Sequence, residues 1–469
     1  MLIKNGFRRH LTELFLAQPA RLIIASFFFL QIIGTFLLML PAAQVKEGAL
    51  PFFQALFTSV SATCVAGLSV HDTFLYFTDF GKAVILVLLQ VGALGLVTLT
   101  ASFFSLMGKK GKNRTILMAQ EATDVQTILK TRNPFRFILL FTLFFEICGS
   151  IIFAIYFIPQ YGWGRGIFYS VFHAVSSFCN AGYDLSGTLS GNQFMRGDMY
   201  NGNPVIMITT AFLIILGGMG FIVWKDLYEF PKKKYLQPHT KIILVGSVIL
   251  IIGGVLLFFL LENQHVLSGS MGKLPASQRP LSAFFLSVNM RSAGYSSLHL
   301  ASLTDGSKLL SVLLMFIGAG PGSVGGGIRI TTAALFLFVL YSEIKGTNEV
   351  VILKKYRVDE ETIKRSVSIF FFAFISILLL TIILLFTEAD QLHKGRFEFL
   401  DILFEATAAF TTTGLSTIGT KNLSFQGQIF VIPFMFIGRV GLLTLALSLF
   451  SSDKKQMEKM YPDGNVLLG

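Results

Sequence analysis

The sequence predicts an all-α polytopic membrane protein built from four similar repeats. Each repeat has a span, a short re-entrant helix, an extended loop and a second span. Of the 469 residues, 53% are hydrophobic and 14% are charged, whereas about a quarter of a soluble protein is charged. Eight apolar segments approach the roughly 20 residues that cross a bilayer. A short glycine-tipped stretch recurs four times between these segments.

The recurring stretch sets the spacing of the repeats. It reads LFTSVSATCVAGLS from Leu56, and its later copies read VFHAVSSFCNAGYDLS, FFLSVNMRSAGYSS and LFEATAAFTTTGLS. The four loop glycines, at spacings of 115, 112 and 120 residues, are Gly67, Gly182, Gly294 and Gly414. Ten residues before each of them stands a phenylalanine, namely Phe57, Phe172, Phe284 and Phe404. Four matches at near-constant spacing predict a fourfold internal repeat.

The apolar segments fall in pairs, with one glycine-tipped stretch inside each pair. They lie near residues 21–41, 82–106, 135–158, 204–224, 240–261, 308–340, 364–387 and 427–450. The run before each glycine has about ten to twelve residues, too few to span, and so predicts a re-entrant helix. The expected repeats are residues 12–107, 125–230, 237–345 and 360–452, with a tail at 453–469. Eight spans and four re-entrant helices are then expected to surround one central pore with pseudo-fourfold symmetry.

Basic residues gather on alternate connections between the spans. Of 38 Lys and Arg residues, 25 lie in residues 4–21, 109–136, 225–241, 345–365 and 454–459. Ten lie on the other connections, and Arg291, Arg329 and Arg439 lie in or beside apolar segments. This positive-inside pattern predicts that both termini are cytoplasmic. It also accounts for the net charge of +12 without a nucleic acid partner.

The second span of repeat three, MFIGAGPGSVGGGIRITT, departs from the pattern of the others. Residues 318–328 contain Pro321 and six glycines, which oppose a continuous helix. Non-helical backbone at membrane depth is tolerated only inside protein or beside a water-filled cavity. A packed kink is the alternative, but we favour a flexible gate loop in a permeation path. Its expected gate residues are Gly318, Gly320, Gly322, Gly325, Gly326 and Gly327, together with Arg439.

The other second spans carry glycine pairs, Gly92/Gly95, Gly217/Gly220 and Gly438/Gly441. Close helix packing at small residues is the expected reason, and glycine there also leaves room for a re-entrant helix to dock.

The glycine-tipped loops suit the binding of a dehydrated cation. Such an ion needs oxygen ligands in place of its hydration shell, and backbone carbonyls can supply them. Glycine permits the backbone conformations that aim successive carbonyls at one axis. Hydroxyls are added by Thr63, Thr411, Thr412 and Thr413, and close approach is allowed by the small residues Ala66, Ala181, Ala293 and Thr413.

With these motifs the whole chain resembles the Trk/Ktr/HKT superfamily of potassium transporters, and most closely its Ktr-type membrane subunits. The resemblance rests on the four repeats, one glycine per loop, the break in repeat three and an arginine in the last span. It implies a selectivity filter that binds potassium at the four loop glycines. The implied filter residues are Thr63, Cys64, Val65, Ala66 and Gly67; Phe178, Cys179, Asn180, Ala181 and Gly182; Met290, Arg291, Ser292, Ala293 and Gly294; and Phe410, Thr411, Thr412, Thr413 and Gly414. Some plant members have serine at the first glycine and favour sodium, so Gly67 points to potassium.

The resemblance implies potassium uptake across the cell membrane, and not an enzyme. It implies a homodimer in the lipid bilayer, controlled by a cytosolic ring of regulator-of-potassium-conductance subunits (KtrA/KtrC-like). The nucleotide belongs to the ring, because this chain has neither a Walker A sequence nor a GxGxxG after a strand. No covalently bound cofactor is expected. A sodium–potassium symporter on the same scaffold, with sodium as co-ion or activator, and a non-transporting scaffold or receptor remain alternatives.

Several polar residues near the loops have two interpretations. Arg291 is expected to brace filter backbone, because a cation beside the pathway would repel the ion, and Asn180 is expected to act similarly. Asp184 either attracts cations at the outer mouth or is a solvated loop acid.

The remaining ionisable residues are expected to have structural roles, with one exception. Glu146 and Glu405 are expected to anchor the re-entrant helices, and His173 to be packed and hydrogen-bonded. Arg439 either pairs with an acid such as Glu405 or, as we predict, holds the exposed carbonyls of the gate loop.

Overall fold

The computed structural model describes most of the chain, including all four glycine-tipped stretches. The described residues are 19–45, 48, 50–107, 134–185, 203–267, 269–347, 349–353 and 355–441. The connection at 108–133 and the tail at 453–469 lie outside the described residues, so the expectations for them remain predictions.

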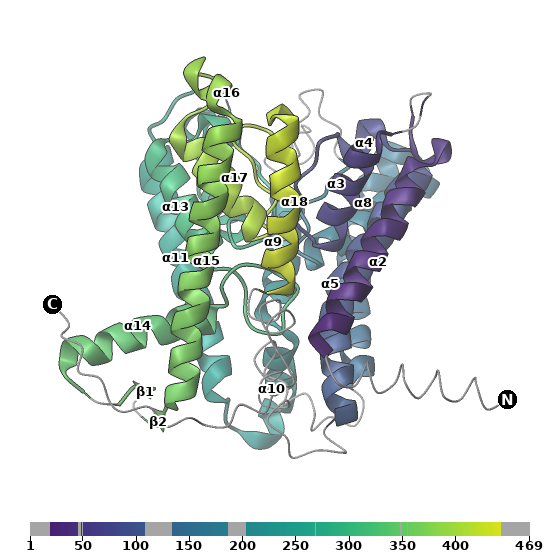
Figure 1. Ribbon diagram of the computed structural model, residues 1–469. Helices are drawn as coiled ribbons and strands as arrows, with labels where there is room; N and C mark the ends of the chain where they lie inside the picture. The colour runs from purple at the N-terminus through teal and green to yellow at the C-terminus, as the bar shows by residue number, and fades with distance from the viewer. Residues whose placement is uncertain are drawn as a thin grey trace, which may run out of the picture.

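Long apolar helices run along one direction of the molecule (Figure 1). They are α2 (Pro19–Met39), α5 (Asp79–Met107), α8 (Pro134–Phe178), α11 (Pro238–Glu262) and α15 (Glu360–Thr387). Among the described residues, α8, α11 and α15 are long and apolar enough to cross a membrane, and a bent pair of helices forms a fourth candidate span. The pair is α9 (Pro204–Met219) and α10 (Phe221–Lys233). Many large apolar side chains on α2, α8, α11 and α15 are exposed, as lipid-facing side chains are.

Short helices lead into the glycine loops, as the repeat predicts. They are α3 (Phe52–Thr63), α12 (Arg279–Asn289) and α17 (Phe399–Phe410). In repeat two the corresponding helix is the last part of α8. Pro159 lies inside α8, and Gly162 breaks its regular backbone with φ 77. We call these four segments the pore helices.

The second span of each repeat packs on the pore helix of the next repeat. α5 packs on α8, including its pore-helix part, where Lys82 Nζ lies over the ring of Tyr169. α9 packs on α12, α13 (Asp305–Phe316) on α17, and α18 (Phe425–Val440) returns to α3. The contacts therefore form a closed cycle around the glycine loops.

The helix break predicted in repeat three is confirmed. α13 ends at Phe316, α14 (Ile330–Lys345) begins 14 residues later, and the gate loop lies between them. α14 does not run along the direction of the long helices but extends to one side of the molecule (Figure 1). The apolar segment 308–340 is therefore not one straight span.

Two glycines expected to serve packing also end helices. α9 and α10 meet at an angle of 91° at Gly220, where φ is 94. α18 ends at Gly441, where φ is 90. Packing alone was therefore an incomplete interpretation, because both positions need a backbone conformation that glycine adopts readily.

Small elements complete the described chain. An antiparallel hairpin pairs β1 (Val351–Ile352) with β2 (Tyr356–Arg357) between α14 and α15. The other elements are α4 (Thr73–Tyr76), α16 (Ala389–His393), η1 (Pro41–Ala43), η2 (Met271–Lys273), η3 (Leu300–Ser302) and η4 (Thr420–Asn422).

Candidate functional site

The four glycine loops, residues 63–67, 178–182, 290–294 and 410–414, meet at the centre of the cycle. We call them the filter loops. A Cβ placed on each loop glycine would come within 3.0 Å of a carbonyl oxygen in another filter loop. That oxygen belongs to the residue directly before the loop glycine of the neighbouring repeat. The pairs are Gly67 with Ala181, Gly182 with Ala293, Gly294 with Thr413, and Gly414 with Ala66. Each loop therefore touches the next one in the order of the repeats, and the last touches the first.

The filter loops share an unusual backbone conformation. Two residues before each glycine a non-glycine residue has positive φ; these residues are Val65 (55), Asn180 (57), Ser292 (60) and Thr412 (49). A positive φ is uncommon outside glycine, above all for β-branched residues. The glycines themselves have φ of 73, 69, 86 and 82. The four residues were expected in the filter, but their left-handed conformation was not predicted, because their only common signal in the sequence is their distance from the glycine.

The same conformation ends the pore helices. Ala66 N donates to Ser61 O, Ala181 N to Ser176 O, and Thr413 N to Ala408 O, at 2.8, 2.8 and 2.9 Å. This six-residue closure is the pattern of a Schellman cap, with Val65, Asn180 and Thr412 in the left-handed position. Each pore helix therefore ends beside its filter loop, with the negative end of its dipole near the centre of the cycle.

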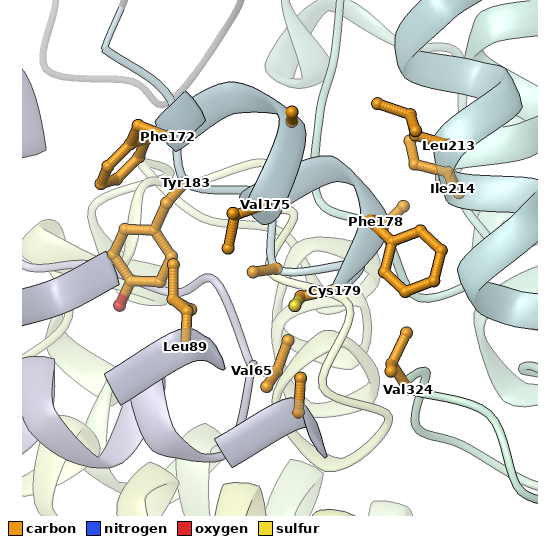
Figure 2. Close-up of a cluster of buried hydrophobic side chains, with 14 of the residues drawn as sticks. Val65, Leu89, Phe172, Val175, Phe178, Cys179, Tyr183, Leu213, Ile214 and Val324 are labelled. Carbon is orange, nitrogen blue, oxygen red and sulfur yellow. The ribbon is translucent and has the colours of Figure 1, made fainter. Parts of the chain in front are cut away.

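The twenty residues of the filter loops are all buried. In Figure 2 the side chains of Val65, Phe178 and Cys179 lie in an apolar cluster with Leu89 and Val324. Their side chains are thus used for packing, which leaves backbone groups for the centre. The Thr63 hydroxyl donates to Ser59 O (2.8 Å) and the Thr411 hydroxyl to Thr407 O (2.7 Å). The protons of these two hydroxyls are therefore held by the pore helices.

The second-span glycines leave room for the pore helices to dock, as the sequence predicts. A Cβ on Gly92, Gly217 or Gly438 would collide with the carbonyl oxygen of Thr63, Phe178 or Phe410, respectively. Each of these carbonyls belongs to the last residue of a pore helix. A larger side chain at any of the three glycines would therefore displace a filter loop.

Arg291 and Asn180 both bond to protein groups beside the filter. Arg291 Nη2 donates to Ser247 Oγ on α11, at 3.2 Å. The Asn180 amide is oriented to donate to Ile214 O and Ser177 O, both at 3.2 Å. These contacts fit the bracing roles expected for the two residues.

Glu405 has the neighbours that anchoring its pore helix requires, whereas for Glu146 this role remains a prediction. Glu405 accepts from the Ser416 and Thr420 hydroxyls, at 2.5 and 2.7 Å, and so ties α17 to the segment after its filter loop. Glu146 on α8 accepts from Gln90 Nε2 on α5, at 3.1 Å.

His173 is fully buried, and its Nε2 accepts from Leu185 N at 3.2 Å, as expected for a packed, hydrogen-bonded side chain. Asp184 is 8% exposed. A solvated loop acid was therefore the wrong alternative for Asp184, whereas a role at the outer mouth remains a prediction.

The gate loop is bound to repeat two by its backbone. Gly320 N donates to Gly218 O (2.8 Å), and Val324 N donates to Gly217 O (3.3 Å). Phe221 N donates to Gly322 O (3.1 Å). These bonds satisfy backbone groups that the break in the helix would otherwise leave without partners.

The gate loop also lies against three of the four filter loops. A Cβ on Gly326 would lie 2.5 Å from Thr411 O, and one on Gly325 would lie 3.4 Å from the side-chain amide of Asn180 and 3.6 Å from Ser292 Cβ. A side chain on Gly326 would collide with the fourth filter loop, and one on Gly325 would collide with Ala319 inside the gate loop. Close approach to backbone carbonyls therefore requires glycine at Gly318, Gly320 and Gly326, in addition to any need for flexibility.

Arg439 meets the gate loop directly, as predicted. It is 3% exposed. Its Nη1 donates to Val324 O, and its Nη2 lies 3.3 Å from Gly92 O and 3.5 Å from Ala93 O. Arg439 therefore connects repeat four, the gate loop and repeat one.

The alternative of a salt bridge between Arg439 and Glu405 is wrong, because Glu405 bonds to Ser416 and Thr420 instead. Sequence inspection missed Arg329, whose Nη1 donates to Gly325 O at 2.6 Å. Its position directly after the glycines was the available signal.

The fold and the site define a multi-pass, all-helical membrane protein with re-entrant loops converging on one point. The family model TrkH, described as a cation transport protein, matches residues 4–458. The chain belongs to this family of membrane cation transporters, which are not enzymes.

Curated relatives match the chain along nearly its whole length. The chain is 36% identical to Ktr system potassium uptake protein B of Bacillus subtilis (strain 168) over 96% of this chain and 97% of that one. It is 34% identical to the protein of the same name from Vibrio alginolyticus, over 96% and 94%. It is 32% identical to potassium/sodium uptake protein NtpJ of Enterococcus hirae, over 96% and 97%.

The fold resembles the crystal structure of the potassium transporter TrkH from Vibrio parahaemolyticus. The TM-score is 0.65 at 16% identity, and the match covers 92% of this chain and 84% of that chain.

Proposed function

We propose that this chain takes up potassium ions across the cell membrane through a pore lined by the four filter loops. The observation that carries the proposal is the closed cycle of filter loops. In this cycle each loop glycine lies against the carbonyl oxygen of the residue that precedes the loop glycine of the neighbouring repeat. Membership of a cation transport family supports it. The names of its relatives, Ktr system potassium uptake protein B and NtpJ, support potassium as the ion.

The architecture proposed for this function has eight spans and four pore helices around one pseudo-fourfold axis. The repeats are residues 12–107, 125–230, 237–345 and 360–452, with a cytoplasmic tail at 453–469. The cyclic packing of each second span on the next pore helix supports this arrangement. The concentration of basic residues on alternate connections supports a cytoplasmic position for both termini.

Ion binding is assigned to the backbone carbonyls of the filter loops. A potassium ion entering from outside exchanges its water for these oxygens. The negative ends of the pore-helix dipoles stabilise the dehydrated ion near the centre of the cycle. No side-chain carboxylate belongs to the filter loops, so selectivity rests on the position of the backbone.

The gate is assigned to residues 318–328 together with Arg439. The gate loop packs against three filter loops, and Arg439 bonds to it while also reaching repeat one. In the proposed closed conformation the loop obstructs the inner end of the filter. Flux then requires the loop to move aside, and the six glycines give its backbone the freedom to do so.

The proposed assembly is a homodimer bound to a cytosolic ring of nucleotide-binding subunits. The word "system" in the names of the Ktr relatives supports a further component. The nucleotide acts on the ring and not on this chain. The lysine-rich connections proposed to be cytoplasmic and the C-terminal tail are the surfaces proposed for docking.

Growth rescue tests the proposed function. Expression of the chain in a bacterial strain without potassium uptake should restore growth at low potassium, and co-expression of a Ktr ring subunit should raise the initial rate of uptake. Strains with the empty vector, and with the ring alone, are the controls. No growth from a chain that is present in the membrane, with or without the ring, would contradict the proposal.

A coupled sodium–potassium symporter is the second candidate, favoured by the name of the relative NtpJ, a potassium/sodium uptake protein. Sodium entry in fixed proportion to potassium entry would support it. Potassium flux that persists without sodium would exclude it.

A further inference from the structure

A tyrosine directly after the third filter glycine reaches across to the second filter loop. Tyr295 follows Gly294, and its side chain is fully buried. Its hydroxyl donates to Ser176 Oγ at 2.6 Å and lies 3.1 Å from Tyr183 O. Ser176 and Tyr183 belong to repeat two, on either side of its filter loop.

The network ends on one backbone carbonyl. Ser176 Oγ donates to Tyr183 O at 2.7 Å, so its own proton is used and its lone pairs accept the proton of Tyr295. The Tyr183 carbonyl thus lies among protein donors and is unavailable to an ion. Because Tyr183 directly follows Gly182, this fixes the peptide at the end of the second filter loop.

Tyr295 is itself held in place. Its backbone N–H donates to Asn289 Oδ1 at 3.1 Å, and Asn289 Nδ2 donates to Phe285 O at 2.7 Å. One chain of hydrogen bonds therefore runs from α12, through Tyr295 and Ser176, to the carbonyl after Gly182. We call this chain the tyrosine strap.

The matching residue is also a tyrosine, Tyr183, in repeat two, but it is a leucine in repeats one and four. In repeats one and four the residue after the glycine is Leu68 or Leu415, both buried among apolar side chains, and neither has a hydroxyl. Leucine at the Tyr295 position is therefore compatible with the fold of a filter loop. The hydroxyl of Tyr295 is thus not required for a filter loop to fold and pack.

The geometry points to Tyr295 as a specificity-determining positioning residue that keeps the end of the second filter loop from contracting around a smaller ion. A filter can select potassium by holding its carbonyl oxygens too far apart to coordinate sodium well, or by fixing the number and orientation of the carbonyls around the ion. A buried, hydrogen-bonded strap between neighbouring loops limits changes in the spacing and in the orientation of these carbonyls. This inference rests on the proposed function.

Removing the hydroxyl should relax selectivity without stopping transport. Tyr295→Phe should lower the potassium-to-sodium uptake ratio about fivefold, the effect expected of one neutral hydrogen bond. The maximal potassium rate should remain, because the strap is not on the ion path. The ratio is measured in proteoliposomes containing the full chain, with rubidium-86 or potassium against sodium-22. It does not depend on the amount of active protein, so a poorly expressed variant still gives an answer.

Further variants separate positioning from packing. Ser176→Ala should lower the ratio similarly, and the double variant Tyr295→Phe/Ser176→Ala should be no worse than the single ones, because both act through one network. Tyr156→Phe removes a tyrosine hydroxyl elsewhere on α8 and should leave the ratio unchanged. An unchanged ratio in Tyr295→Phe, or additive losses in the double variant, would overturn the inference.

The same experiment distinguishes this failure from failure of the proposed function. If the unmodified protein carries no potassium, the function itself is wrong. If it selects potassium and Gly67→Ser loses that preference while Tyr295→Phe keeps it, only the role of the tyrosine strap is wrong.

Discussion

Gly67→Ser should lose most of the preference of the protein for potassium over sodium. Gly67 has φ 73, and a side chain there would collide with Ala181 O and lie 3.1 Å from Gly414 Cα. A non-glycine residue in a sparsely populated backbone region costs about 1–3 kcal/mol. The first filter loop can relieve that strain only by shifting against its two neighbours. A relative change of about 1.4 kcal/mol between the two ions is a tenfold change in preference, and we expect at least about that loss.

Gly162→Ser is the matched control for Gly67→Ser. Gly162 has a similar φ of 77, but a Cβ there would have no neighbour within 4 Å. The control therefore introduces comparable backbone strain far from the filter loops, and its ion preference should equal that of the unmodified protein. Uptake affinities for both ions are measured for each variant. If Gly67→Ser retains normal preference while present at normal levels, glycine does not set the carbonyl geometry of the filter.

Arg439→Ala, and deletion of residues 323–326 from the gate loop, should raise the maximal rate of potassium uptake. Both changes remove the bond between Arg439 and Val324 O, and Arg439→Ala also removes the contacts with Gly92 O and Ala93 O. A hydrogen bond to a charged group contributes about 1.5–3 kcal/mol. Losing it from the closed conformation should shift the balance toward the open one by about tenfold or more. Filter selectivity should not change, and control by the ring subunit should weaken.

Arg439→Lys tests the geometry of the contact. Lysine keeps the charge, but its single ammonium group lacks the planar fork with which the arginine reaches two carbonyl regions. Its maximal rate should therefore fall between those of the unmodified protein and Arg439→Ala. Initial rates in proteoliposomes, with and without the ring, decide the matter. Lower flux in both Arg439→Ala and the loop deletion, with intact folding and assembly, would mean that the loop is structural and the gate lies elsewhere.

The repeat and its glycines could be read from the sequence because they depend on local chemistry. Gly67 and its three counterparts recur at nearly constant spacing, and six glycines in the gate loop exclude a regular helix. The meeting of Arg439 with the loop was also predictable, because a charge inside an apolar span needs polar partners. Potassium as the expected ion came from the resemblance to a family, and not from these patterns.

Other features depend on contacts that no local pattern records. Val65 and Thr412 are β-branched and give no sign in the sequence of the left-handed backbone that they adopt where their pore helices end. Gly220 looked like a packing residue until the gate loop was seen to occupy the bend beside it. The tyrosine strap joins residues 119 positions apart. Such contacts become visible only when neighbouring repeats are placed side by side.

The central claim is that backbone carbonyls of the four filter loops bind the transported ion. The direct measurement is the position of rubidium ions, located by anomalous diffraction in crystals of the full chain grown with rubidium in place of potassium. The account predicts a peak at the centre of the cycle, within coordination distance of carbonyls from all four filter loops, and a weaker peak in Gly67→Ser. An ordered rubidium ion bound elsewhere in a transport-competent protein, with none among the filter loops, would contradict it.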